Sequence, residues 1–142
     1  MKVKRLNEKA VIPTRGSNEA AGYDLYACLE EPVEIAPGET KSIGIGLAME
    51  VPAGNFGGIF ARSGLSRDEG LRPANCLGVV DSDYRGEVIV ALHNDSKETR
   101  VVTNGQKIAQ LIILPYLPIY FTEVDELSST ERNANGFGST GR

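Results

Sequence analysis

Five short stretches of the sequence combine polar side chains with glycine in patterns that could carry chemistry. In the first, residues 20–27, Asp24 stands between an aromatic and an aliphatic residue. A carboxylate in apolar surroundings must be paired, hydrogen-bonded or close to a metal, because burial otherwise raises its pKa. An Asp24 that faces solvent on an edge strand is the alternative, and the sequence leaves both open.

The second stretch, residues 60–66, places Arg62, Ser63 and Gly64 where a helix is expected to begin. Backbone N–H groups at a helix start, together with a guanidinium, attract anions such as phosphate. Ser-Gly is also common in ordinary turns, so this stretch alone is a weak signal.

The third stretch, residues 75–86, combines an amide, a glycine and a carboxylate. The Asn75 side chain offers both a donor and an acceptor to a base edge, and Gly78 permits close approach of the backbone. Asp81 follows an apolar pair, which suits a positioned general base. The alternative is a β-hairpin whose residues 81–83 are turn chemistry.

The last two stretches are residues 104–112 and 136–141. Gln110 lies inside an apolar run, so its amide is either satisfied in the core or in contact with a ligand. Residues 136–141 are small, apart from Phe137, and could surround phosphates with backbone amides. They lack the Gly-Lys-Ser/Thr of a Walker loop.

The elements that position these stretches are predicted to be strands. Large apolar side chains alternate with mostly small ones over residues 43–51, which indicates a strand with its large side chains on one face. Residues 88–92 and 111–114 are short apolar runs that favour strands buried on both faces. The one helix expected covers residues 63–69, with Ser63 as N-cap and Gly70 as C-cap. The sequence therefore predicts an all-β sandwich or barrel-like roll.

The end of the chain differs in composition from the rest. Residues 128–142 contain a single large apolar side chain, Phe137. Such a segment cannot bury enough surface to offset its ordering entropy, so it is either a disordered tail or a lid that closes over a ligand. We therefore divide the chain into a β-rich domain, residues 1–127, and a C-terminal lid, residues 128–142.

Length and charge restrict the possible partners. The chain has 142 residues, enough for one domain, and a net charge of −4, which argues against a broad basic surface for nucleic acid. No apolar run is long enough to span a membrane, and the first residues do not resemble a secretory signal. Cys28 and Cys76 are expected to be reduced thiols of a cytoplasmic protein, and the lone His93 to be structural.

Taken together and in this order, the five stretches resemble the five motifs of the trimeric deoxyuridine triphosphate nucleotidohydrolase (dUTPase) family. The resemblance extends from residue 20 to residue 141. It implies a homotrimer of jelly-roll-like subunits with active sites at the subunit interfaces. The implied reaction is Mg²⁺-dependent hydrolysis of dUTP to dUMP and pyrophosphate, which limits uracil in DNA and supplies dUMP for thymidylate synthesis.

The resemblance also implies roles for individual residues in the nucleoside part of the site. Asp81 is similar to the general base that activates water for attack on the α-phosphorus. Asn75 and the backbone around Gly78 and Val79 would recognise uracil on a hairpin too narrow for cytosine or thymine. Tyr84 would stack beneath the deoxyribose and exclude a 2′-hydroxyl.

For the phosphates, the resemblance implies contributions from other subunits and from Mg²⁺ held mainly by phosphate oxygens and water, with no direct protein ligand. A neighbouring subunit would contribute Arg62, Ser63, Gly64 and Gln110, with Asp24 in support. The lid of the third subunit would place Arg132 on the γ-phosphate, Phe137 over uracil, and Gly138, Ser139 and Thr140 around the phosphates. The sequence departs from the family at Asn133 and Asn135, where glycine is common, and at Lys107, where arginine is more usual.

Two other readings remain open at this point. A deoxycytidine triphosphate deaminase would share the fold and bind a similar nucleotide, but its catalytic acid is a glutamate in a differently patterned third motif. A non-catalytic nucleotide-binding regulator could use the same scaffold. Asp81 and Tyr84 match the hydrolase pattern, and the complete tail argues against a regulator.

Overall fold

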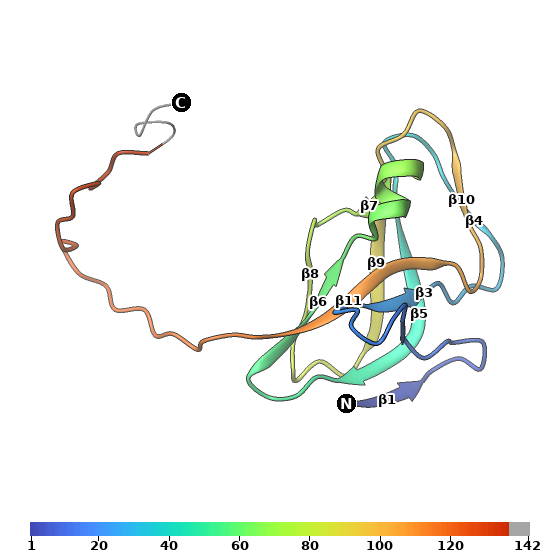
Figure 1. Ribbon diagram of the computed structural model, residues 1–142, viewed down its shortest axis with the longest axis horizontal. Helices are drawn as coiled ribbons and strands as arrows, with labels where there is room; N and C mark the ends of the chain where they lie inside the picture. Colours follow the sequence, from blue (N-terminus) through green and yellow to red (C-terminus); the bar gives the residue numbers. More distant parts are fainter. Residues whose placement is uncertain (137–142) are drawn as a thin grey trace.

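The computed structural model describes residues 1–136, which form a β-rich body followed by an extended C-terminal segment (Figure 1). Within these residues there are eleven strands and one short helix. They are β1 (Lys2–Arg5), β2 (Thr14–Arg15), β3 (Tyr23–Tyr26), β4 (Val33–Ile35), β5 (Thr40–Glu50), β6 (Asn55–Phe60), η1 (Leu65–Glu69), β7 (Leu71–Pro73), β8 (Gly78–Val80), β9 (Glu87–Asn94), β10 (Arg100–Val102) and β11 (Lys107–Pro115). The prediction of a mostly β fold is confirmed.

The strands form two larger antiparallel sheets and one small one. One sheet has the order β1-β5-β9-β7, the second β2-β3-β11-β6-β8, and β10 pairs with β4. A single apolar cluster takes side chains from both larger sheets, with Ile43 and Val90 from the first and Leu25 and Leu111 from the second. The core therefore lies between the two sheets and fixes one against the other.

Strand β5 has the alternating pattern expected for residues 43–51, with Ile43, Ile45 and Leu47 all buried. Its pairing with β9 shifts register between Gly44 and Ala48, which marks a β-bulge. Gly46 lies in this bulge with a φ of +68°, a conformation that favours glycine.

The expectation that residues 88–92 are buried on both faces is wrong. In β9, Val88 and Val90 are each 2% exposed, whereas Ile89 is 52% exposed. In the run 111–114 of β11, Leu111 is buried and the next three residues are half-buried. One face of each antiparallel sheet packs on the core, and β-branched residues fit either face of a strand, so an unbroken apolar run does not require burial on both.

The predicted helix is present over residues 63–69, but Ser63 is not its cap. Residues 63 and 64 are already helical, with a hydrogen bond from the Ser66 N–H to the Arg62 carbonyl at 3.0 Å, and they lead into η1. Ser63 therefore lies inside the helix. Helix η1 is one wide turn, closed by a hydrogen bond from the Gly70 N–H to the Leu65 carbonyl. Gly70 has a φ of 71° and ends the helix as predicted, because this left-handed conformation suits glycine.

After Pro115 the chain leaves the body, and residues 116–136 run away from it in Figure 1. Several large apolar side chains of this C-terminal segment are uncovered: Leu117 is 87%, Tyr120 96% and Phe121 92% exposed. Within residues 1–136, no other part of the chain covers them. Residues 137–142, with the predicted lid residues Phe137, Gly138, Ser139 and Thr140, lie outside the described residues.

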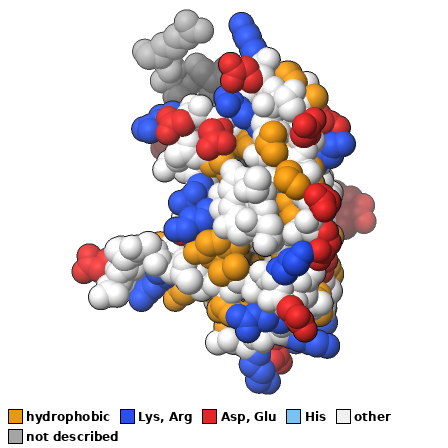
Figure 2. All heavy atoms as spheres, turned by 90° about the vertical axis from the view of Figure 1, so that its right-hand side faces the viewer, with side chains coloured by type: hydrophobic (Ala, Val, Ile, Leu, Met, Phe, Trp, Pro, Cys, Tyr) orange, Lys and Arg blue, Asp and Glu red, His pale blue; other side chains and the backbone are white. Residues whose placement is uncertain are grey.

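Charge and hydrophobicity are mixed on the surface of the body. On the face shown in Figure 2, basic and acidic side chains are interspersed, with apolar patches between them. No helix within residues 1–136 is long and apolar enough to cross a membrane.

Candidate active site

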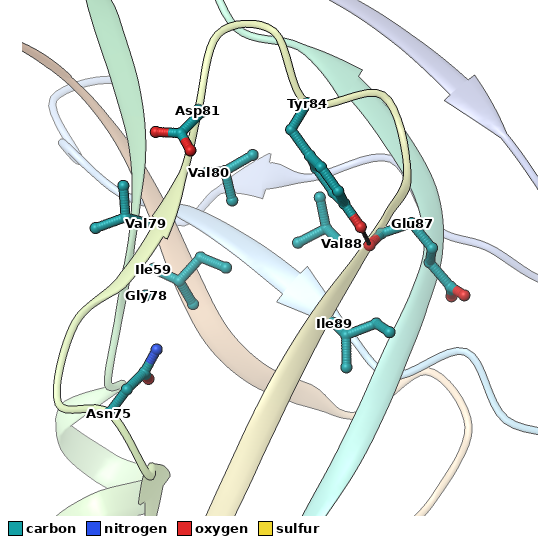
Figure 3. Close-up of a pocket in the computed structure, with 10 residues that line it drawn as sticks. All are labelled: Ile59, Asn75, Gly78, Val79, Val80, Asp81, Tyr84, Glu87, Val88 and Ile89. Atoms are coloured by element: carbon teal, nitrogen blue, oxygen red, sulfur yellow. Dashed lines mark hydrogen bonds between the residues drawn. The ribbon is translucent and has the colours of Figure 1, made fainter.

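The predicted nucleoside residues meet in one cavity beside strands β8 and β9, which we call the hairpin cavity (Figure 3). It has a volume of about 250 Å³. Its wall is made of Ile59, Asn75, Gly78, Val79, Val80, Asp81, Tyr84, Glu87, Val88 and Ile89. The structure thus brings together Asn75, Gly78, Val79, Asp81 and Tyr84, five residues singled out from the sequence.

A tight turn and a close strand contact place Asn75 at one end of this cavity. The Leu77 N–H donates to the Asn75 carbonyl at 2.6 Å, and Cys76 between them has a φ of 59°. Gly78 then pairs with Ile59 on β6, where an added Cβ would lie 3.1 Å from the Ile59 Cβ. Gly78 therefore lets β8 lie close against β6, and its backbone forms part of the cavity wall.

Asp81 and Tyr84 stand on the turn that joins β8 to β9. The Tyr84 N–H donates to the Asp81 carbonyl at 3.2 Å, and Arg85 Nη1 donates to the carbonyls of Ser82 at 2.7 Å and Tyr84 at 2.9 Å. The Asp81 side chain is exposed, so its carboxylate is accessible to water. A carboxylate fixed by its backbone and open to water can accept a proton from a bound water molecule.

The Tyr84 ring is held at the opposite side of the cavity. Its hydroxyl donates to the Glu87 carbonyl at 2.9 Å, as the dashed line in Figure 3 marks. The ring lies over Gly86, where an added Cβ would overlap the phenol oxygen. With 46% of its surface exposed, Tyr84 presents a flat apolar ring that a sugar can stack on.

A second group of predicted residues, which we call the cation cluster, lies on the five-stranded sheet. Asp24 is 9% exposed, and its two carboxylate oxygens bind different cations, Arg62 Nε at 2.9 Å and Lys107 Nζ at 2.7 Å. The hydrogen bond to Asp24 raises the pKa of Lys107. Two cations share one carboxylate, so the cluster keeps one net positive charge.

Adjacent strands position the cation cluster. Gln110 on β11 pairs with Asp24 on β3 and with Phe60 on β6. The Gln110 Nε2 donates to the Ala61 carbonyl at 2.8 Å, which leaves its side-chain oxygen free to accept a further hydrogen bond. That oxygen occupies the space where a Cβ at residue 22 would lie, so Gly22 makes room for the amide.

The cation cluster borders a cavity of about 290 Å³. Its wall is made of Gly16, Ala20, Gly22, Asp24, Arg62, Ser63, Gly64, Lys107 and Gln110, which include all four predicted phosphate residues of the body. This cavity and the hairpin cavity share no lining residue. Among the described residues of one chain, therefore, the general-base candidate and the phosphate-binding candidates of the body do not meet in a single cavity.

Arg132 is the one predicted substrate-binding residue of the lid that lies within the described part of the chain. Its Nε donates to the Asn135 carbonyl at 2.8 Å, within the C-terminal segment, and Arg132 lines neither of the two cavities. Asn133 has a φ of 43°, in the left-handed region that asparagine tolerates better than most residues.

Residues not chosen from the sequence also line the two cavities. Glu87 and Ile89 belong to the hairpin cavity, and Lys107 belongs to the cation cluster. The alternation of β9 could have placed Glu87 and Ile89 on the face opposite Val88. The contact between Lys107 and Asp24 has no signal in the sequence.

Comparison with known proteins assigns the chain to a family. The dUTPase family model matches residues 8–141. Deoxyuridine 5'-triphosphate nucleotidohydrolase of Nautilia profundicola is 47% identical over 142 residues, covering 100% of this chain and 99% of the relative. The enzyme of the same name from Syntrophotalea carbinolica is 43% identical and covers 99% of this chain and 96% of the relative. The chain therefore belongs to the dUTPase family.

Solved structures agree with this assignment. The dUTPase of Staphylococcus bacteriophage 80alpha, solved with dUpNHpp, has a TM-score of 0.84 and 29% identity, covering 99% of this chain and 98% of that one. A mutant dUTPase from phage phi11 of S. aureus, whose structure reveals molecular details for the coordination of a structural Mg(II) ion, has a TM-score of 0.80 and 27% identity, covering 90% of this chain and 98% of that one. The enzyme class is accordingly dUTP diphosphatase, and the resemblance seen in the five stretches is confirmed.

Proposed function

We propose that this protein hydrolyses dUTP to dUMP and pyrophosphate with Mg²⁺, in sites shared between three copies of the chain. The observation that carries the proposal is the hairpin cavity, which places an amide, an accessible backbone, a carboxylate and a tyrosine ring around one space. Each of these groups matches one part of a deoxyuridine nucleotide.

The uracil ring fits the end of the hairpin cavity that Asn75, Gly78 and Val79 line. Uracil presents one N–H donor between two carbonyl acceptors, and the Asn75 amide with the nearby backbone offers the complementary acceptor and donors. Cytosine reverses part of this pattern and would leave polar groups unpaired, which strongly disfavours its binding. The thymine methyl needs space that the narrow hairpin lacks.

Asp81 acts as the general base. Its carboxylate takes a proton from a water molecule as the water oxygen attacks the α-phosphorus. The bond from this phosphorus to the oxygen that bridges to the β-phosphorus then breaks, and pyrophosphate leaves. Phosphoryl transfer depends on positioning and charge stabilisation, and no covalent intermediate with the protein is needed.

The phosphates of a substrate held in one hairpin cavity reach the cation cluster of a neighbouring copy. Asp24 holds Arg62 through Nε, so the two Nη groups of the guanidinium remain free to bind phosphate oxygens. Ser63, Gly64 and Gln110 contribute further donors beside it. Because each chain holds these groups in two separate cavities, a shared site explains how they act on one substrate.

The metal-ligand atoms that the described residues offer fit a Mg²⁺ ion that is held mainly by substrate phosphates and water. Both oxygens of Asp24 already bind cations, and residues 1–136 contain no group of three acidic, histidine or cysteine side chains that could enclose a metal. Mg²⁺ commonly keeps several waters and binds substrate phosphates. When bound, it neutralises phosphate charge.

The uncovered C-terminal segment supports the homotrimer. Each large apolar side chain that becomes fully buried stabilises an assembly by about 1.5–3 kcal/mol. Leu117, Tyr120 and Phe121 are far more exposed than apolar residues of the body, and neighbouring copies would cover them. Residues 128–142 then close the site as a lid, with Arg132 on the γ-phosphate and Phe137 and residues 138–140 over the nucleotide. In a cytoplasmic setting this activity limits uracil in DNA and supplies dUMP.

The test is pyrophosphate release from dUTP, dCTP, dTTP and UTP with Mg²⁺, together with the mass of the protein in solution. We expect release from dUTP far above the other three and the mass of three chains. Ammonia release from dCTP would instead identify a deaminase, and nucleotide binding without turnover would identify a regulator. A monomeric mass with full activity would contradict the shared site.

A further inference from the structure

Glu87, the first residue of β9, makes hydrogen bonds at both its ends. Its carboxylate Oε1 accepts from the Gly46 N–H at 2.8 Å, and its backbone carbonyl accepts from the Tyr84 hydroxyl at 2.9 Å. Figure 3 shows its carboxylate directed away from the cavity while its carbonyl faces the phenol. Glu87 therefore links the turn that carries Tyr84 to strand β5.

The β5 bulge is shaped to receive this carboxylate. The β5–β9 register shifts between Gly44 and Ala48, and Ala48 is the residue that pairs with Glu87. Gly46 lies within the shift, so its N–H turns to the carboxylate. A Cβ at Gly44 would overlap Glu87 Oε1, so the missing side chain of Gly44 leaves the space that the carboxylate fills.

The bulge itself is fixed from two other directions. The Leu6 N–H donates to the Gly46 carbonyl at 2.8 Å, and the Cys28 N–H donates to the Gly44 carbonyl at 2.9 Å. A Cβ at Gly46 would lie 2.7 Å from Cys28 Sγ, which shows how closely the segments pack. The carboxylate of Glu87 thus binds a backbone site that is held by its own hydrogen bonds.

We propose that Glu87 is a positioning residue for Tyr84 and thereby helps to set the selection of deoxyribose over ribose. The proposal rests on the proposed function, in which the Tyr84 ring lies beneath the sugar. The Glu87 carboxylate holds the start of β9 in place, and the Glu87 carbonyl holds the Tyr84 hydroxyl. The Tyr84 ring then stays close enough to the sugar to leave no room for a 2′-hydroxyl. A ring free to shift would make room for the hydroxyl group of UTP.

The experiment measures kcat/KM for dUTP and for UTP in the wild type and in Glu87→Ala, Glu87→Gln and Gly44→Ala. In Glu87→Ala we expect the ratio of kcat/KM for dUTP to that for UTP to fall about tenfold, because the loss of one hydrogen bond to a charged group has an effect of about that size. Glu87→Gln keeps an acceptor oxygen for the Gly46 N–H and should retain the wild-type ratio. Gly44→Ala should lower the ratio as Glu87→Ala does, because the new methyl group displaces the carboxylate.

The double variant Glu87→Ala/Gly44→Ala tests the coupling directly. Without the carboxylate the methyl group has nothing to displace, so the double variant should match Glu87→Ala. The control is Glu39→Ala, which also removes a carboxylate that accepts from a backbone N–H, that of Ala36 at 2.9 Å, just before the other end of β5. It should leave the ratio unchanged.

The outcomes separate this proposal from the proposed function. A wild type that hydrolyses dUTP and UTP equally well would contradict the proposed role of Tyr84 and the function with it. A selective wild type whose ratio is unchanged in Glu87→Ala would overturn the positioning role alone. If Glu87→Ala does not fold, an unchanged ratio in Gly44→Ala overturns it, and a lowered ratio with Glu87→Gln unaffected supports it.

Discussion

The hairpin cavity and the cation cluster are built in different ways. In the hairpin cavity, turns and glycines expose the backbone, and its polar side chains Asn75 and Asp81 are open to solvent. In the cation cluster, charged side chains from neighbouring strands bind one another around the buried Asp24. The first arrangement discriminates by shape and by hydrogen-bond pattern, and the second attracts negative charge without regard to the base. Selectivity and phosphate affinity should therefore respond separately to mutation.

The largest effect is expected for Asp81→Asn. General-base catalysis contributes about a hundredfold to ten-thousandfold, so kcat should fall about a thousandfold while nucleotide binding stays close to wild type. Pyrophosphate release gives kcat, and calorimetry with a non-hydrolysable dUTP analogue gives affinity. Asp83→Asn, in the same turn, is the matched control and should keep most activity. Turnover retained in Asp81→Asn would remove this residue from the role of base.

A smaller effect is expected for Arg62→Gln. Loss of charge-assisted hydrogen bonds to phosphate should raise the Kd for the dUTP analogue about ten- to a hundredfold. The preference for uracil over cytosine should not change, because the hairpin cavity is intact. Binding of the dUTP and dCTP analogues is compared by calorimetry, and Arg67→Gln, on an exposed arginine of helix η1, is the control. A change in base preference would show that the two regions are not separable.

Deletion of residues 128–142 should lower dUTP turnover about tenfold or more, as expected for the loss of a charged phosphate contact and of a closing segment. The number of chains in the oligomer and the thermal unfolding temperature should stay at the wild-type values, because the body ends at Pro115. Deletion of residues 116–142 removes the uncovered apolar side chains as well and should reduce the oligomer. Full turnover without residues 128–142 would contradict the lid.

The smallest effect concerns Lys107 and pH. The hydrogen bond to Asp24 raises the pKa of Lys107 above 10.5, so its stabilising effect is fully present below pH 10.5 and is lost as pH rises through the folded-state value. Thermal unfolding of Lys107→Met should therefore differ from wild type at pH 8 and converge with it as pH rises through the folded-state pKa of Lys107. Lys41→Met, which removes an exposed pair with Glu39, is the control. A difference that persists at high pH would point to packing of the lysine stem.

The sequence predicts the body better than the contacts between its parts. Alternation over residues 43–51 identifies β5, and Gly70 marks the end of η1. The helical range 63–69 is also predicted correctly, whereas the wide turn of η1 and the place of Ser63 inside the helix have no signal in the sequence. Burial of residues 88–92 was overestimated because apolar composition alone does not separate the two faces of β9.

The predicted site residues are distributed between two cavities, and two of the links that hold them depend on long-range geometry. Glu87 reaches Gly46 only because β5 bulges, and residue patterns do not report a register shift. Lys107 reaches Asp24 because β11 pairs with β3. Such contacts depend on which strands become neighbours in the sheet, so the spacing of residues along the sequence does not predict them.

The separation of the two cavities has a genetic consequence. A chain with Asp81→Asn still carries an intact cation cluster, and a chain with Arg62→Gln still carries an intact hairpin cavity. If each site takes the two cavities from different copies, two defective chains that assemble together rebuild about a quarter of the sites at equal mixing. Two defective alleles would then complement each other in one cell, and a defective allele would also weaken sites that contain wild-type chains.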